Sequence, residues 1–144
     1  MATLQIDKTL TALAGEFLVA GQLCLKGYVA SLTFKNYPKV DIFYLNPQNN
    51  KHSAIQVKTI RHGDAYYISE DVDDSEHPFV FVRINDDDSV EFFVAPAKDV
   101  VKLSAKERDD YLKKHPNVKR GQPRMLGVKN LVAFKDRWDV LTLR

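Results

Sequence analysis

Hydrophobic residues recur every three or four positions over the first part of the chain, from about residue 8 to residue 26. This spacing predicts an amphipathic helix, because residues three and four apart lie on one helical face. Asp7 precedes the segment as an N-cap, and Gly27 follows it at the place where a left-handed residue ends a helix. The apolar stripe expected to face the core is Leu10, Leu13, Phe17, Ala20 or Gly21, and Cys24.

After Gly27 the pattern changes to short runs rich in β-branched and aromatic residues, which predict strands. Three such runs follow one another at 28–35, 39–45 and 53–60, and the turns between them suit antiparallel hairpins. Two more lie at 78–84 and 90–95, and the first of these is apolar on both sides, as in a strand covered on both faces. The polar stretch from 61 to 77 predicts a surface excursion or a short helix.

Two further helices are predicted towards the C-terminus. Ser104, with Glu107 three residues later, resembles a capping box and predicts a helix over 105–114. Apolar residues at helical spacing predict a packed helix within 131–143, after a basic loop at 115–128. Together these elements predict a single domain of the α/β or α+β class, in which helices flank a mixed sheet of about five strands.

Length and composition agree with one ordinary globular domain. The chain has 144 residues, of which 44% are hydrophobic and 28% are charged. Its single cysteine, Cys24, excludes an intramolecular disulfide and a cysteine-based zinc cluster. The sequence shows no secretion signal and no run of about 18 apolar residues, so we expect a cytoplasmic protein that does not enter a membrane.

Charge is strongly segregated along the chain, although the net charge is only +2. Residues 64–101 hold 2 basic and 11 acidic residues, whereas residues 102–144 hold 12 basic and 5 acidic residues. The basic C-terminal third is therefore a candidate surface for a polyanion such as DNA, with Lys119, Arg120 and Arg124 as backbone contacts. The alternative is that acidic loops and a basic tail neutralise one another across a solvated surface.

Four polar side chains interrupt segments that should be largely buried. Strand alternation places Gln56 and Lys58 on one face of the third predicted strand, and Asp41 lies in the strand before it. Because an unpaired buried charge is costly, we expect these three groups to meet. Glu16 lies beside the apolar stripe of the first helix and can reach the same sheet edge. Carboxylate and amide oxygens are hard donors that suit Mg²⁺ or Mn²⁺.

The order of Glu16 on a helix, Asp41 on one strand and Gln56-Val57-Lys58 on the next resembles the PD-(D/E)XK nuclease superfamily. The resemblance covers most of the chain and implies a restriction-endonuclease-like fold and a Mg²⁺-dependent (or Mn²⁺-dependent) DNA endonuclease, a hydrolase used in restriction or repair. It implies Asp41, Gln56, Glu16 and the Val57 carbonyl as metal ligands, and Lys58 as the catalytic lysine. Val40 replaces the proline of the motif, and Gln56 replaces its acid, as in the QXK variant of Mrr-type endonucleases.

Each of these residues also has a simpler interpretation. Lys58 is typical of a strand lysine whose stem covers apolar surface, and Glu16 of a solvated helix residue. Asp41 can pair with Lys39, and Gln56 can satisfy a backbone group. The corresponding alternative function is a non-catalytic DNA-binding or protein-interaction module on a nuclease scaffold. A homodimer is a further hypothesis, because a duplex has two strands to cut.

Overall fold

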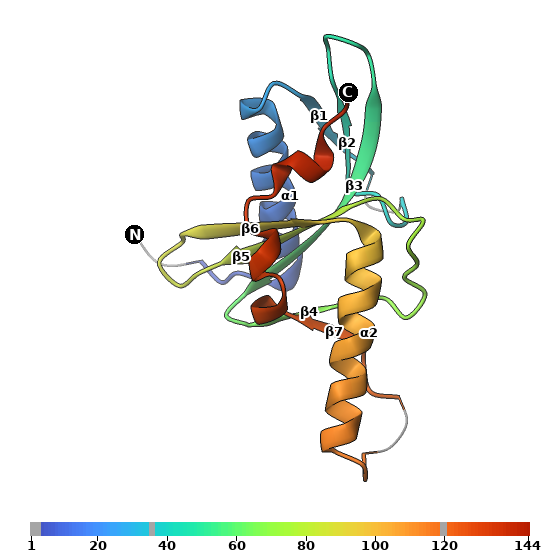
Figure 1. Cartoon of the computed structure of the whole chain (residues 1–144). Helices are drawn as coiled ribbons and strands as arrows, with labels where there is room; N and C mark the ends of the chain where they lie inside the picture. The colour runs from blue at the N-terminus through green and yellow to red at the C-terminus, as the bar shows by residue number, and fades with distance from the viewer. Residues whose placement is uncertain (1–3, 35–36, 119–120) are drawn as a thin grey trace.

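A mixed five-stranded sheet forms the centre of the computed structural model, which describes residues 4–34, 37–118 and 121–144. The sheet has the order β1 (Val29–Leu32), β2 (Ile42–Leu45), β3 (His52–Arg61), β5 (Phe79–Ile84) and β6 (Val90–Ala95) (Figure 1). Neighbouring strands are antiparallel except β3 and β5, which run parallel. The expected mixed sheet and its α+β class are confirmed.

Helix α1 (Lys8–Leu25) covers one face of this sheet, and the side chain of Asp7 accepts a hydrogen bond from the Leu10 N–H, as the N-cap prediction requires. The prediction of its buried face is wrong. Leu10 is 51% exposed and Phe17 is 60% exposed, whereas the buried positions are Gly15, Val19 and Leu23. The reason is a close approach to β3, since a Cβ added at Gly15 would lie only 1.7 Å from the Thr59 Oγ1. Gly15 therefore lets the backbone of α1 approach β3 closely, and Val19 and Leu23 pack on the same face.

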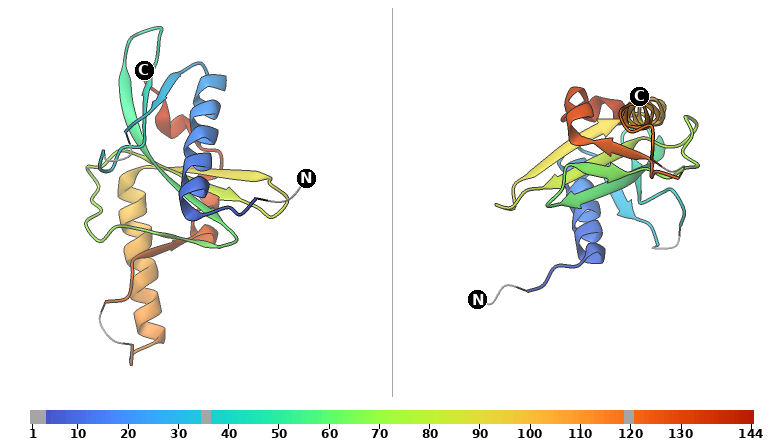
Figure 2. Two further views of the ribbon diagram at one scale, coloured as in Figure 1. Left: turned by 180° about the vertical axis from the view of Figure 1, so that it is seen from behind. Right: turned by 90° about the horizontal axis from the view of Figure 1, so that it is seen from below.

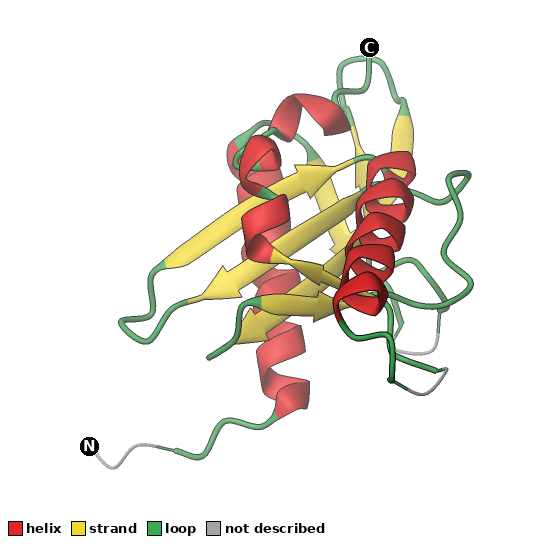
Figure 3. Ribbon diagram, turned by 60° about the horizontal axis from the view of Figure 1, so that its bottom comes forward, coloured by secondary structure: helices red, strands yellow, loops and turns green. Residues whose placement is uncertain are grey.

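The first turns of helix α2 (Ala97–Lys114) pack in a hydrophobic cluster on the opposite face (Figure 3), and the rest of the helix extends past the five-stranded sheet (Figure 2). It begins directly after Pro96 and not at residue 105, because the chain passes from β6 straight into the helix. Ser104 is thus buried within the helix, and its hydroxyl donates to the Val100 carbonyl at 2.6 Å. A two-stranded sheet of β4 (Ala65–Tyr67) and β7 (Met125–Gly127), which the sequence pattern did not predict, lies beside α2.

The C-terminal segment forms three short 3-10 helices and not the expected single helix: η1 (Val128–Asn130), η2 (Val132–Phe134) and η3 (Trp138–Leu141). Lys135 pairs with Phe93 of β6, and Asp136 has a positive φ of 53°, so the chain turns between η2 and η3. The Tyr44 hydroxyl donates to the Leu141 carbonyl at 2.9 Å and fixes the end of the segment. In the described part of the chain no helix is long and apolar enough to span a membrane.

The apolar side chains of β3 belong to two hydrophobic clusters, one on each face of the sheet. Ile55 and Val57 pack in the cluster of α1, whereas Ile60 packs in the cluster of α2. Because side chains alternate along a strand, Gln56 and Lys58 project towards the face of α2. Their register partners on β5, Phe79 and Phe81, belong to that same cluster.

Candidate active site

The predicted site lies where β2 and β3 diverge. Pairing between these strands begins at Ile42 and Ile55, while β3 continues to Arg61 along β5. Asp41 stands just before β2, and its N–H donates to the Ile55 carbonyl at 2.9 Å. The Thr33 N–H donates to the Asp41 carbonyl at 2.9 Å and joins the two loop ends. Backbone bonds on both sides therefore fix Asp41 at the edge of β3.

The carboxylate of Asp41 binds the backbone of the Gln-Val-Lys tract. Its Oδ2 accepts a hydrogen bond from the Val57 N–H at 2.7 Å. In a strand the N–H and C=O of one residue point to the same side, so the Val57 carbonyl also faces this edge. Burial raises the pKa of Asp41, and the Val57 N–H and the nearby Lys58 ammonium oppose that rise.

Glu16 and Asp41 line the same cleft, which has a volume of about 370 Å³. Thr33 and Phe34 form one wall of the cleft, and the first turns of α1 form the other. This places a carboxylate from α1 and a carboxylate from the residue before β2 on one cleft. Gln56 and Lys58, which project towards the face of α2, are not among the described residues that line it. Gly15 precedes Glu16, so the close contact between α1 and β3 also sets the position of Glu16.

Gln56 contacts a residue that the sequence pattern did not single out. It is only 7% exposed, and its Nε2 donates to the Glu76 Oε2 at 2.8 Å. The Lys39 ammonium lies 2.8 Å from the Glu76 Oε1 and 3.2 Å from the Asp71 Oδ2. These two carboxylates raise the pKa of Lys39. Lys39, considered above as a partner for Asp41, therefore holds the loop after β4 beside the site. In Figure 2 the loop before β2, which carries Lys39, lies next to the loop after β4.

Of the three residues predicted to contact DNA, the structure describes only Arg124. Lys119 and Arg120 lie outside the described residues. Arg124 is only 8% exposed, and its guanidinium donates to the Ser104 Oγ and to the Val101 carbonyl, each at 2.7 Å. The prediction for Arg124 is wrong, because the residue is buried and two of its three guanidinium nitrogens tie the segment before β7 to α2.

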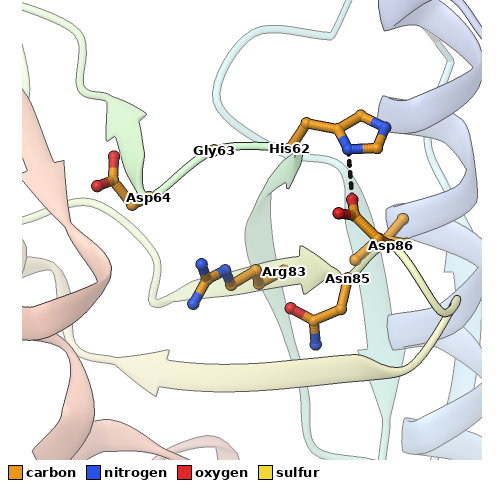
Figure 4. A pocket seen from close by; sticks show the side chains of 7 residues that line it. His62, Gly63, Asp64, Arg83, Asn85 and Asp86 are labelled. Atoms are coloured by element: carbon orange, nitrogen blue, oxygen red, sulfur yellow. Dashed lines mark ion pairs between the residues drawn. The ribbon is translucent and has the colours of Figure 1, made fainter.

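A larger polar cavity of about 670 Å³ lies at the far end of β3 (Figure 4). The ring of His62 faces Asp86 there, while Arg83 and Asn85 reach the cavity from β5 and the turn after it. None of the four predicted catalytic side chains is among the described residues that line it. Cavity size therefore does not mark the predicted site.

The donor set at the β2–β3 divergence fits a hard divalent cation. Two carboxylates, from Glu16 and Asp41, share the cleft, and the Val57 carbonyl faces the same strand edge. Within residues 4–34, 37–118 and 121–144, His, Cys, Asp and Glu side chains form no group of three that could hold a metal ion. A site here would thus combine carboxylates with amide or backbone oxygens. Comparisons with protein-family models and with curated proteins found no match to this chain.

Proposed function

We propose that this chain is a metal-dependent DNA endonuclease of the PD-(D/E)XK superfamily. The observation that carries the proposal is the bond between the Asp41 carboxylate and the Val57 N–H, at the centre of Gln56-Val57-Lys58. It brings the two parts of the sequence motif into contact across the β2–β3 divergence. The order of elements supports the same assignment. Helix α1 leads into the antiparallel strands β1, β2 and β3, and β5 then pairs in parallel with β3.

Asp41, Glu16, the Gln56 amide oxygen and the Val57 carbonyl are the groups that would hold Mg²⁺ or Mn²⁺. When bound, such an ion acidifies a coordinated water and neutralises charge on a phosphodiester. Lys58 follows Val57, which binds Asp41, and lies on the same face of β3 as Gln56, so its ammonium would donate hydrogen bonds to the attacking water or to the phosphate oxygens. Lys113, Lys114 and Lys129 are exposed at the end of α2 and after β7, and they would bind the DNA backbone.

A second candidate is a DNA-binding or protein-interaction module that keeps this scaffold without turnover. One observation favours it: Gln56 is neutral at the position where the motif has an acid. Fewer negative ligands weaken affinity for a divalent cation. The two functions differ in one measurable property, because the enzyme must bind Mn²⁺ or Mg²⁺ and an inactive scaffold need not.

Nicking of supercoiled plasmid tests the proposal. With Mg²⁺ or Mn²⁺ present we expect wild-type protein to convert plasmid to the open circular form, and we expect chelator to stop it. Asp41→Ala and Lys58→Ala should each reduce the rate by at least about a hundredfold, as loss of a catalytic group typically does. Lys51→Ala, which removes an exposed lysine just before β3, is the matched control and should retain full activity. A Lys58→Ala protein that nicks as fast as wild type would refute the proposed mechanism.

A further inference from the structure

Glu76 carries a carboxylate that is almost fully buried and lies against the proposed site. Its side chain is 9% exposed and makes three contacts. Its Oε2 accepts from Gln56 at 2.8 Å, and its Oε1 accepts from the Lys39 ammonium at 2.8 Å and from the Asp73 N–H at 3.3 Å. A carboxylate only accepts hydrogen bonds, so the atom of Gln56 that faces it is fixed as the amide nitrogen.

We propose that Glu76 is a positioning residue that sets the orientation of the Gln56 carboxamide and keeps its oxygen available to a divalent cation. The nitrogen and the oxygen of a primary amide point in diverging directions, so binding of Nε2 by Glu76 turns Oε1 away from Glu76. The flipped amide would bring two acceptor oxygens together in a partly buried place, which is costly. This inference rests on the proposed function, in which Gln56 is a ligand through its oxygen.

Glu76 also supplies negative charge next to the position where the motif normally has an acid. Gln56 is neutral, and Glu76 is its neighbour at 2.8 Å. Lys39 compensates part of that charge and at the same time restrains the Glu76 side chain. Partners that orient a metal ligand in this way commonly change metal affinity by about 10- to 100-fold when they are removed.

The variant Glu76→Gln separates orientation from packing because the two side chains have nearly the same shape. Lys39 would keep the one oxygen of the new amide, so the Nε2 of residue 76 would face Gln56. Gln56 would then turn its own oxygen towards residue 76 and away from the cation. Exchanging the two residues, in the double variant Q56E/E76Q, restores the donor and acceptor pair with the carboxylate at position 56.

Two measurements on the full chain test this inference. In metal-free wild type we expect the Gln56 side-chain amide protons, followed by NMR, to exchange slowly with solvent, and in Glu76→Ala to exchange fast. In titrations with Mn²⁺ we expect Glu76→Gln to weaken binding at least about tenfold, and Q56E/E76Q to return it to within about threefold of wild type. Glu70→Gln is the matched control: it removes a glutamate of the same loop, bound to Arg108 and not to Gln56, and should leave both measurements unchanged.

The possible outcomes separate the two proposals. Fast exchange of the Gln56 amide in wild type overturns the role of Glu76 whatever the protein does with metal. If wild type and Glu76→Gln bind Mn²⁺ equally tightly, the role of Glu76 is overturned and the nuclease proposal stays intact. Slow exchange in wild type, without Mn²⁺ binding at millimolar concentration, overturns the nuclease proposal and the ligand role of Gln56 together.

Discussion

Gly15 and Gly21 lie in the same helix, and we predict that alanine has opposite effects at the two positions. A Cβ at Gly15 would stand 1.7 Å from the Thr59 Oγ1, half of the 3.4 Å at which ordinary contact begins. Rotation of Thr59 does not remove the overlap, because its Cβ would also be only 2.8 Å away. A Cβ at Gly21 would meet nothing within 4 Å.

The magnitudes follow from two competing effects. Alanine in place of glycine favours a helix by about 1 kcal/mol, while overpacking a core costs about 1–3 kcal/mol. Because α1 must move away from β3, we expect the larger cost at Gly15, and a net loss of about 1–2 kcal/mol for Gly15→Ala. Gly21→Ala should gain about 0.5–1 kcal/mol. At about 3 °C per kcal/mol, Tm should fall by roughly 3–6 °C in the first variant and rise by roughly 2–3 °C in the second.

Thermal unfolding followed by circular dichroism measures both changes. A double-mutant cycle with Thr59→Ala identifies the contact, since Gly15→Ala should cost less when the Thr59 Oγ1 and Cγ2 are absent. Gly15→Ala should also weaken Mn²⁺ binding, because Glu16 follows Gly15 and moves with the helix. If Gly15→Ala is as stable as Gly21→Ala, the close approach of α1 to β3 does not exist as described.

Two further substitutions test the burial of charged groups. Asp41→Asn, measured in chelator, should raise the free energy of unfolding at pH 7, because a neutral amide replaces a carboxylate whose charged form is disfavoured by burial. Burial raises the pKa of Asp41, so folding favours the protonated form of its carboxyl. Wild-type protein therefore becomes more stable relative to Asp41→Asn as the pH falls, and the difference between them should vanish by about pH 4. An equal difference in stability at pH 7 and at pH 4 contradicts this. Arg124→Met should lower the free energy of unfolding by about 2–3 kcal/mol, measured in urea, because two buried hydrogen bonds are lost. If Arg124→Met is as stable as wild type but binds DNA more weakly, Arg124 is instead a DNA contact.

Local sequence signals predicted the five strands of the central sheet, but they predicted neither β4 and β7 nor the buried face of α1. β6 was predicted with its observed bounds, because turn residues precede it and Pro96 follows it. In α1 the larger apolar residues, such as Leu10 and Phe17, indicated one face, yet the helix buries the face of Gly15 and Val19. Burial there depends on how closely a helix backbone can approach β3, and hydrophobic periodicity does not measure that distance.

In the candidate site, the sequence predicted a contact between adjacent strands but not the contacts made by residues from distant loops. Register and alternation predicted that Asp41 meets the Gln56-Val57-Lys58 tract, since these residues lie on adjacent strands of a hairpin. Glu76 could not be identified, because it is one of 11 acidic residues in 64–101 and reaches Gln56 from a loop whose path the sequence does not specify. Arg124 appeared to belong to a basic surface, since sequence composition does not distinguish an exposed guanidinium from a buried one.

The divergence of β2 from β3 is what makes a polar site compatible with this core. Inside a continuous ladder the Val57 N–H would bind a neighbouring strand, and no carboxylate could reach it. Because β2 leaves β3 just before this point, the Val57 N–H is satisfied by Asp41, and burial then raises the pKa of that carboxyl. A bound cation would offset the cost of this buried charge more effectively than any neutral partner, since its field acts directly on the carboxylate. We therefore expect Mn²⁺ to stabilise wild-type protein against unfolding, by an amount that disappears in Asp41→Asn.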